Sequence, residues 1–185
     1  MEAYTYDIKI PHERVAVLIG KDGTIKKRLE QETKTSLDVD SKEGNVSVTG
    51  EDALTLYTAR EIISAVGRGF NPEVALRLLK SDYAFELIQL ADYARNKNDE
   101  KRLKGRVIGQ EGKSRRLVEE LTSTDVTVYG KTIGIIGEAY NVSIARRAVV
   151  SLLNGSTHAK VYKWLEQQRK KGMEDTSAFE QAETE

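Results

Sequence analysis

The stretch Leu18-Ile-Gly-Lys-Asp-Gly23 returns later in the same chain of 185 residues as Val107-Ile-Gly-Gln-Glu-Gly112. The first glycines of the two stretches are 109 − 20 = 89 residues apart. At an offset of 137 − 50 = 87 residues, Val46-Ser-Val-Thr-Gly50 aligns with Ile133-Gly-Ile-Ile-Gly137. A match that continues over about 60 residues indicates an internal repeat, and two copies are too few for a solenoid, which needs at least three.

Both copies predict the same order of elements, which we take from alternating and helical hydrophobic spacing. In the first copy, strands are predicted over 4–10, 35–39 and 46–48, and helices over 11–19, 24–33 and 52–66. In the second copy, strands are predicted over 85–90, 126–129 and 132–136, and helices over 99–108, 113–121 and 140–153. The fold class is therefore α+β, with the order β-α-α-β-β-α in each copy.

The repeat also predicts the domain organisation. A short connecting helix over 73–79 follows the first copy, and a C-terminal helix over 159–171 follows the second copy. We therefore expect one domain over residues 1–80, a second over 81–171, and an acidic, disordered tail over 172–185.

The net charge is zero, with 29 basic and 29 acidic residues, but it is unevenly spread. Residues 81–171 contain 17 basic and 11 acidic side chains, a surplus of 17 − 11 = 6. Seven basic residues and one acidic residue lie within 101–116. After Gly172 the tail contains acidic residues and no Lys or Arg. The basic middle favours a polyanionic partner, such as a nucleic acid.

Composition excludes several classes of protein. Cysteine is absent, which excludes disulfides, a cysteine nucleophile and thiolate metal sites. The two histidines, His12 and His158, lie far apart, and we expect both on the surface. No apolar run is long enough to span a membrane, and the N-terminus does not resemble a secretory signal. We therefore expect a soluble, cytoplasmic protein with no metal, no cofactor and no membrane contact.

The glycine motif has a chemistry of its own. A helix N-terminus attracts anions through its unpaired N–H groups and its dipole, and glycine lets a ligand approach the backbone closely. Its spacing differs from that of the phosphate-binding loop of nucleotide triphosphatases. No nuclease-type carboxylate cluster stands out either, so we expect no catalytic residue and no enzyme activity.

This repeated pattern resembles the KH domain, a single-stranded nucleic-acid module whose GxxG loop clamps about four nucleotides. The element order is similar to that of type I KH domains, so the resemblance implies two tandem type I KH domains. Further likeness to archaeal two-KH ribosomal RNA assembly proteins lies in Gly67-Arg-Gly-Phe-Asn-Pro-Glu-Val-Ala-Leu-Arg-Leu-Leu79, Val128-Tyr-Gly-Lys-Thr132, Leu152-Leu-Asn-Gly155 and Val161-Tyr-Lys-Trp-Leu-Glu166.

The resemblance implies a role in ribosome biogenesis and rRNA processing. We expect a single-stranded RNA-binding factor that binds small-subunit rRNA near its 3′ end and assists endonucleolytic maturation. The implied protein partners are a processing endonuclease or a translation initiation factor. Two other functions stay open: a protein-interaction module with little direct RNA binding, and a KH protein that binds single-stranded DNA.

The expected RNA-binding residues are the two loops, their basic neighbours and two apolar groove positions. The second domain is expected to dominate, because the helix before its loop carries dense positive charge. Acidic side chains within both loops, Asp22 and Glu111, depart from the basic loops of many KH domains. By resemblance, one groove is lined by Ile19, Ile25, Leu37 and Val39, and the other by Ile108, Val126 and Val128. The complete set is Gly20, Lys21, Asp22, Gly23, Lys26, Lys27, Arg28, Lys104, Arg106, Ile108, Gly109, Gln110, Glu111, Gly112, Lys113, Arg115, Arg116 and Val128.

Overall fold

The computed structural model describes the backbone of residues 3–182 and the side chains of residues 3–173. The chain divides into two compact units, Met1–Phe85 and Glu86–Glu185. The sequence predicted this division between Lys80 and Ser81, so the observed boundary lies slightly later. Each unit contains one copy of the repeat, although the first strand of the second copy begins before the boundary, at Tyr83.

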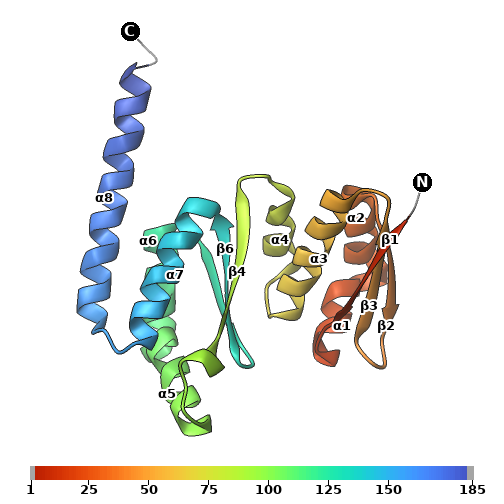
Figure 1. Cartoon of the computed structure of the whole chain (residues 1–185), viewed down its shortest axis with the longest axis horizontal. Helices are drawn as coiled ribbons and strands as arrows, with labels where there is room; N and C mark the ends of the chain where they lie inside the picture. Colours follow the sequence, from red (N-terminus) through yellow and green to blue (C-terminus); the bar gives the residue numbers. More distant parts are fainter. Residues whose placement is uncertain (1–2, 183–185) are drawn as a thin grey trace. The chain divides into compact units, whose positions relative to one another are not determined.

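The first copy has the predicted order of elements (Figure 1). Its strands are β1 (Tyr4–Lys9), β2 (Ser36–Asp40) and β3 (Asn45–Gly50). Its main helices are α1 (His12–Ile19), α2 (Thr24–Thr33) and α3 (Ala53–Gly67), and a 3₁₀ turn, η1 (Lys21–Gly23), separates the first two. The predicted connecting helix is a short α4 (Pro72–Ala75) followed by a 3₁₀ turn, η2 (Leu76–Leu79).

The second copy repeats this arrangement. Its strands are β4 (Tyr83–Gln89), β5 (Asp125–Tyr129) and β6 (Thr132–Glu138). Its helices are α5 (Lys97–Ile108), α6 (Lys113–Thr122) and α7 (Ala139–Leu153), followed by the C-terminal α8 (His158–Ala182). The short 3₁₀ turns are η3 (Leu90–Asp92) and η4 (Gln110–Gly112).

The two sheets have the same topology. Their strand orders are β1-β3-β2 and β4-β6-β5, so the last strand of each copy lies in the middle. Antiparallel pairing places Leu37 opposite Val48 in the first sheet and Val126 opposite Ile135 in the second. Figure 1 shows α1, α2 and α3 on one side of the first sheet, and α5, α6 and α7 on one side of the second. The predicted fold class, two α+β units of type I order, is confirmed.

Each unit has its own hydrophobic core between its sheet and its helices. In the second unit, the middle strand β6 is buried through Ile133 and Ile135, which pack with Val149 and Leu152 of α7. The helix α8 packs against α6 and α7 through Val161 and Leu165. The sequence predicted these apolar positions, because they follow the helical and strand periods.

The C-terminal helix is longer than the sequence predicted. We expected it to end at Lys171 and to be followed by a disordered tail, but α8 continues to Ala182. The residues after Gly172 include Met, Glu, Ala and Gln, which are good helix formers, and they contain no proline to end the helix. Residues 183–185 of the predicted tail lie outside the described residues.

Candidate nucleic-acid interface

The two glycine loops have nearly the same backbone conformation. Gly20 and Gly109 have φ/ψ values of 74°/172° and 72°/175°. Gly23 and Gly112 have values of 75°/15° and 76°/11°, and each precedes a helix. Between them, Asp22 and Glu111 also have positive φ, at 54° and 52°. The repeat seen in the sequence is therefore a repeat of loop geometry.

The first and second glycines of each loop have different structural reasons. A Cβ on Gly109 would lie 2.6 Å from Ser114 Cβ and 2.8 Å from Ser114 N, so this glycine lets the loop pack on the next helix. Gly20 is similarly constrained by Ile25, at 2.5 Å. In contrast, a Cβ on Gly112 would have no neighbour within 4 Å. The open side of the loop therefore lies at its second glycine, next to the start of the helix.

The glycine N–H groups are already used within the chain. Gly20 N donates to Ala16 O, and Gly23 N donates to Gly20 O. In the second loop, Gly109 N donates to Gly105 O, and Gly112 N donates to Gly109 O. The sequence-based expectation that all N–H groups of Gly109–Gly112 take phosphate is therefore narrowed to the two middle residues of each loop.

The basic residues around the first loop fall into two groups. Lys21 and Lys27 are exposed, and Lys27 lies beside the open glycine, with its Cε 3.7 Å from a Cβ built on Gly23. Arg28 instead forms a bidentate ion pair with Glu73, at 2.9 and 3.0 Å. Lys26 lies 3.9 Å from Glu30. The first loop therefore presents two lysines that point to no carboxylate among the described ion pairs.

The basic residues around the second loop are mostly engaged inside the unit. Lys104 pairs with Glu100 at 3.0 Å, and Arg115 pairs with Glu119 at 2.9 Å. Arg116 donates from Nη2 to Glu111 O at 2.7 Å and so holds the loop itself. Lys113 is exposed, without a described ion pair. The charge density that favoured the second domain in the sequence is thus partly used internally, and charge no longer separates the two loops.

Arg106 is tied to the end of α7. Its Nε donates to Leu152 O at 3.0 Å, and its Nη2 donates to Ser156 O at 2.6 Å. In the first unit, Arg14 makes the same kind of contact with Val66 O and Phe70 O, at 2.8 and 2.7 Å. These arginines stabilise the carbonyl ends of α7 and α3. We therefore leave Arg106 out of the interface proposed below.

The two histidines differ in exposure. His12 is exposed, as expected. His158 is half-buried, and its Nε2 lies 2.7 Å from Arg106 O, so the predicted exposed linker position is wrong for this residue. Its ring also packs against Tyr162, with centroids 5.9 Å apart. The reason is that α8 begins at His158 itself and folds back on the second unit.

The sequence analysis missed a glutamate that joins each loop helix to the neighbouring strand. Glu119 Oε1 accepts from Val126 N at 2.8 Å, and Arg115 donates to both Glu119 and Val126 O. Glu30 Oε1 accepts from Leu37 N at 2.8 Å in the same way. The signal was present, since 119 − 30 = 89 is the offset of the glycine loops and each glutamate follows a basic residue by four positions.

The apolar groove positions divide between core and surface. Leu37 and Val126 are only 3% exposed, so they are core residues. The half-buried members of the set, which keep some surface for a ligand, are Ile19, Ile25, Val39, Ile108 and Val128. Ser114 lies beneath Gly109 with its hydroxyl buried and without a hydrogen-bond partner. The corresponding residue of the first copy is Ile25, so Ser114 fills a packing position and faces no ligand.

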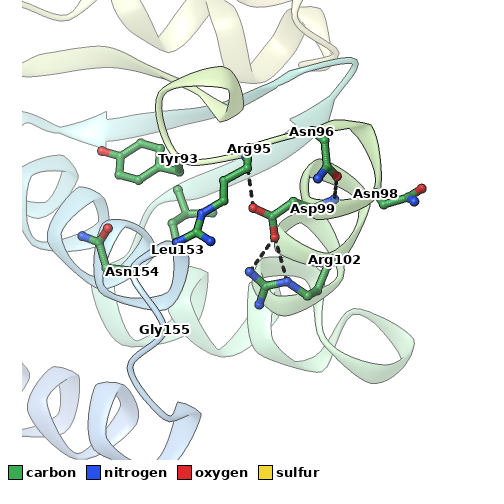
Figure 2. Close-up of a pocket in the computed structure, with 9 residues that line it drawn as sticks. All are labelled: Tyr93, Arg95, Asn96, Asn98, Asp99, Arg102, Leu153, Asn154 and Gly155. Atoms are coloured by element: carbon green, nitrogen blue, oxygen red, sulfur yellow. Dashed lines mark hydrogen bonds and ion pairs between the residues drawn. The ribbon is translucent and has the colours of Figure 1, made fainter.

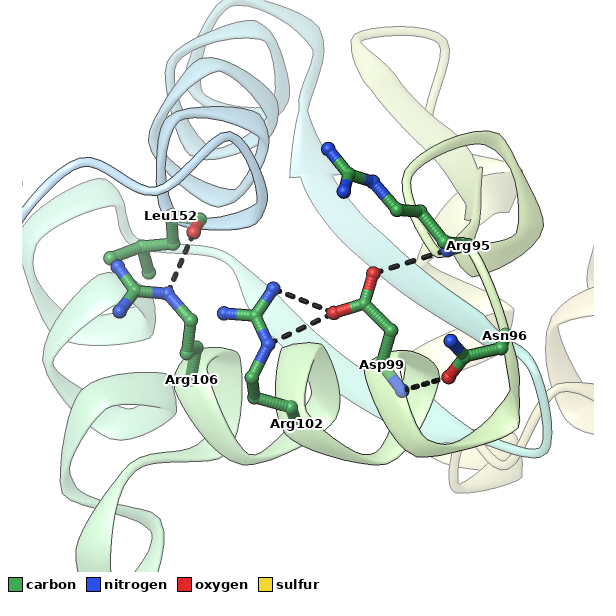
Figure 3. A network of polar contacts seen from close by, with 6 residues as sticks. All are labelled: Arg95, Asn96, Asp99, Arg102, Arg106 and Leu152. Atoms are coloured by element: carbon green, nitrogen blue, oxygen red, sulfur yellow. Dashed lines mark hydrogen bonds and ion pairs between the residues drawn. The ribbon is translucent and has the colours of Figure 1, made fainter.

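A separate polar pocket of about 620 Å³ lies at the start of α5 (Figure 2). Asp99 organises its wall by accepting from Arg95 N at 3.1 Å and from Arg102 Nε and Nη2 at 2.9 and 2.7 Å (Figure 3). The hydrogen bond from the Arg95 backbone, followed by that from Arg102, lowers the pKa of Asp99 below its ordinary value. Asn96 caps the helix by accepting from Asp99 N at 2.9 Å. This network fixes the end of α5 opposite its glycine loop.

Two further searches concern metal and membrane. Among the described residues, His, Asp and Glu side chains form no cluster of three that would hold a metal ion. No helix in the described part of the chain is long and apolar enough to cross a membrane.

The order of elements and the glycine loops define the class of protein. Residues 84–170 match the model of a eukaryotic-type KH domain, type I, and residues 5–65 match the general KH-domain model. Neither model describes a catalytic family. The chain is therefore a tandem KH-domain protein, as the sequence predicted.

Relatives narrow this class. A KH domain-containing protein of Methanocaldococcus jannaschii is 51% identical over 168 residues, which cover 89% of this chain and 74% of the relative. The RNA-binding protein pno-1 of Caenorhabditis elegans is 34% identical over 130 residues, and the match covers 69% of this chain but only 47% of that protein. This chain thus spans about half the length of that eukaryotic relative.

A solved structure supports the same assignment. A chain in the crystal structure of an a/eIF2alpha–aDim2p–rRNA complex from Pyrococcus horikoshii has a TM-score of 0.84 and 42% identity. The match covers 91% of this chain and 96% of that chain. The chain belongs to the KH-domain family that includes the RNA-binding and pre-rRNA-processing proteins PNO1 and Dim2.

Proposed function

We propose that this protein is a non-enzymatic, single-stranded RNA-binding factor of small-subunit ribosome assembly, acting in the cytoplasm. It binds rRNA near the 3′ end and assists endonucleolytic maturation of that end. The observation that carries the proposal is the pair of glycine loops with the same backbone geometry, each opening at a helix N-terminus beside exposed lysines.

The loops suit a phosphate backbone. A helix N-terminus carries a partial positive charge, and the open glycine gives an anionic oxygen access to the backbone. Lys21 and Lys27 at the first loop and Lys113 at the second add charge that is not neutralised by a described ion pair. The half-buried apolar residues near the loops then contact bases or sugars. Phosphate contacts give affinity, whereas base contacts give sequence preference.

A translation initiation factor is the protein partner that the comparisons favour. The Pyrococcus horikoshii complex contains a/eIF2alpha together with aDim2p and rRNA, and this chain is similar to a chain of that complex over nearly its whole length. The endonuclease partner rests only on the family resemblance. We therefore include both partners in the proposal, with the initiation factor as the better supported one.

RNA binding at the loops is tested by adding one carboxylate to each loop. Lys21→Asp gives the first loop two adjacent acidic residues, and Gln110→Asp does so in the second loop. Both positions are exposed, so the changes leave the core intact. We expect each variant to weaken binding of a labelled single-stranded RNA that matches the small-subunit rRNA 3′ end. The loss at the substituted loop should be about tenfold, or about 1.4 kcal/mol.

Gln110→Lys is the matched control, because it adds the opposite charge at the same place. It should strengthen binding and steepen its salt dependence, since each phosphate contact releases counterions. If Lys21→Asp, Gln110→Asp and the wild-type protein bind RNA equally, the loops are structural and the protein-interaction function replaces this proposal. Competition with a DNA of the same sequence separates RNA from single-stranded DNA, because only RNA has the 2′-hydroxyl.

A further inference from the structure

A small hollow lies between α7 and α8 of the second unit, away from the residues of the glycine loops. Its volume is about 240 Å³. Its lining contains two cations, two hydroxyls and one indole, and no acidic side chain. The residues are Arg147, Ser151, Ser156, Lys160, Val161 and Trp164. We call this feature the α7–α8 hollow.

The walls of the hollow are held by internal hydrogen bonds. Ser156 N donates to Ser151 O at 3.0 Å, which closes the turn after α7. Arg106 donates to Ser156 O at 2.6 Å from the other side. Val161 N donates to Thr157 O at the start of α8, and its side chain is buried in the core. The hollow is therefore formed before any ligand binds.

Its arginine is also positioned in advance. The guanidinium carbon of Arg147 lies 5.0 Å from the centroid of the Trp164 ring, which is a cation–π contact. Stacking fixes the plane of the guanidinium but leaves its N–H groups available for an acceptor. Among the described side chains, neither Arg147 nor Lys160 forms an ion pair with a carboxylate.

The positive charge continues along α8. Lys163 follows Lys160 by one helical turn, and Lys170 and Lys171 follow two turns later. All four lysines are exposed, whereas Val161 and Leu165 occupy the buried face of the helix. Over residues 158–173 the charge is 5 − 1 = +4, with Glu166 as the one acidic residue. The hollow thus lies at the beginning of a basic stripe.

We propose that the α7–α8 hollow binds a phosphate group of the RNA strand that extends beyond the glycine loops. The inference rests on the RNA-binding function proposed above and adds a second contact with the RNA backbone. A planar guanidinium, an ammonium and serine hydroxyls are the groups that proteins use for phosphate oxygens. The hollow is smaller than the roughly 300–1,000 Å³ of sites for drug-sized ligands, so it fits one phosphate with its sugar.

The test compares two lengths of RNA. One labelled RNA has about 5 nucleotides, close to the number that a KH loop clamps, and the other has about 20 nucleotides from the same rRNA 3′ region. The variant is Arg147→Gln/Lys160→Gln/Lys163→Gln. The matched control is Lys97→Gln/Lys101→Gln/Arg169→Gln, which removes three exposed cations of the same unit from outside the hollow. Thermal unfolding verifies that both variants are folded.

We expect the hollow variant to bind the short RNA as the wild type does, within a factor of about two. It should bind the long RNA about tenfold more weakly, and the slope of log K against log salt should flatten by about 2, or about 0.7 for each lost phosphate contact. The control should keep most of the affinity for the long RNA.

The inference is overturned if the hollow variant binds the long RNA like the wild type, or if the control loses as much affinity as the hollow variant. Equal competition by polyglutamate of matched charge would also overturn it and would assign the hollow to an acidic protein. The failure of wild-type protein to bind the short RNA would instead contradict the proposed function of the loops. The two proposals therefore fail in different ways.

Discussion

The two glycines of one loop differ in what they allow. Gly109 combines a φ of 72° with a ψ of 175°, a region that is almost restricted to glycine, and a Cβ there would collide with Ser114. Gly112 has a left-handed conformation with open space around it. A nonglycine residue in that conformation costs about 1–2 kcal/mol.

We therefore predict unequal effects for Gly109→Ala and Gly112→Ala. The first should lower the free energy of unfolding by about 3 kcal/mol, because strain and a steric clash add. The second should lower it by about 1 kcal/mol. Urea denaturation of both variants measures the difference. Equal losses would show that the loop does not pack on α6 through its first glycine.

Two carboxyl groups at the residue scale should respond to pH with opposite signs. Burial raises the pKa of Glu61 above its ordinary value of 4.5, with a smaller opposing effect from Arg60. Hydrogen bonds from Arg95 and Arg102 lower the pKa of Asp99 below 3.8. A raised folded-state pKa gives stability that is lost as pH rises through it, whereas a lowered one gives stability that is lost as pH falls through it.

Glu61→Gln should therefore raise the free energy of unfolding at neutral pH and have no such effect below the ordinary pKa of the carboxyl. Asp99→Asn should lower it at neutral pH, and the loss should shrink as the solution is made acidic. Denaturation between about pH 3 and pH 8 measures both curves. If the two variants show pH dependences of the same sign, the environments described for these groups are wrong.

At the scale of elements, the most informative repeat is the glutamate that joins a loop helix to a strand. Glu119 accepts the N–H of Val126, and Arg115 holds the same carboxylate and the carbonyl of Val126. Glu119→Ala would leave that strand N–H without its partner. We predict a loss of about 1–3 kcal/mol in unfolding free energy.

Glu119→Gln is the matched control, because its carbonyl oxygen still accepts from Val126 N. It should cost about 1 kcal/mol, from the weakened contact with Arg115. The same pair of changes at Glu30 should rank in the same order, since Leu37 N is held in the same way. A Gln variant as unstable as the Ala variant would show that the ion pair, and not the strand N–H, is the main contribution.

The sequence predicted the elements well because their signals are local. Alternation and helical spacing placed the strands and helices within a few residues, and the glycine repeat placed both loops. It could not predict how basic residues are used, because their partners are distant in sequence. Arg106 bonds to Leu152 and Ser156, and Arg28 bonds to Glu73. The end of α8 was missed because the acidic composition of the tail was weighed above its helix propensity.

At the scale of the whole molecule, the two units are joined by a short segment, 80–82, between η2 and β4. A short connection gives the second loop a high effective concentration once the first loop has bound the same strand. Two weak loops on one chain are then sufficient for tight binding. This matters here because each loop contains an acidic residue, Asp22 or Glu111, that weakens its own attraction for phosphate.

We predict that the loops act together only on long RNA. With an RNA of about 5 nucleotides, Lys21→Asp or Gln110→Asp should leave one site with unchanged affinity and halve the stoichiometry. With about 20 nucleotides, either single change should weaken binding by about 10- to 100-fold, because the linked contact is lost. Titration calorimetry measures both stoichiometry and affinity. Equal losses on short and long RNA would mean that one strand never engages both loops, and the units would then act on separate segments of RNA.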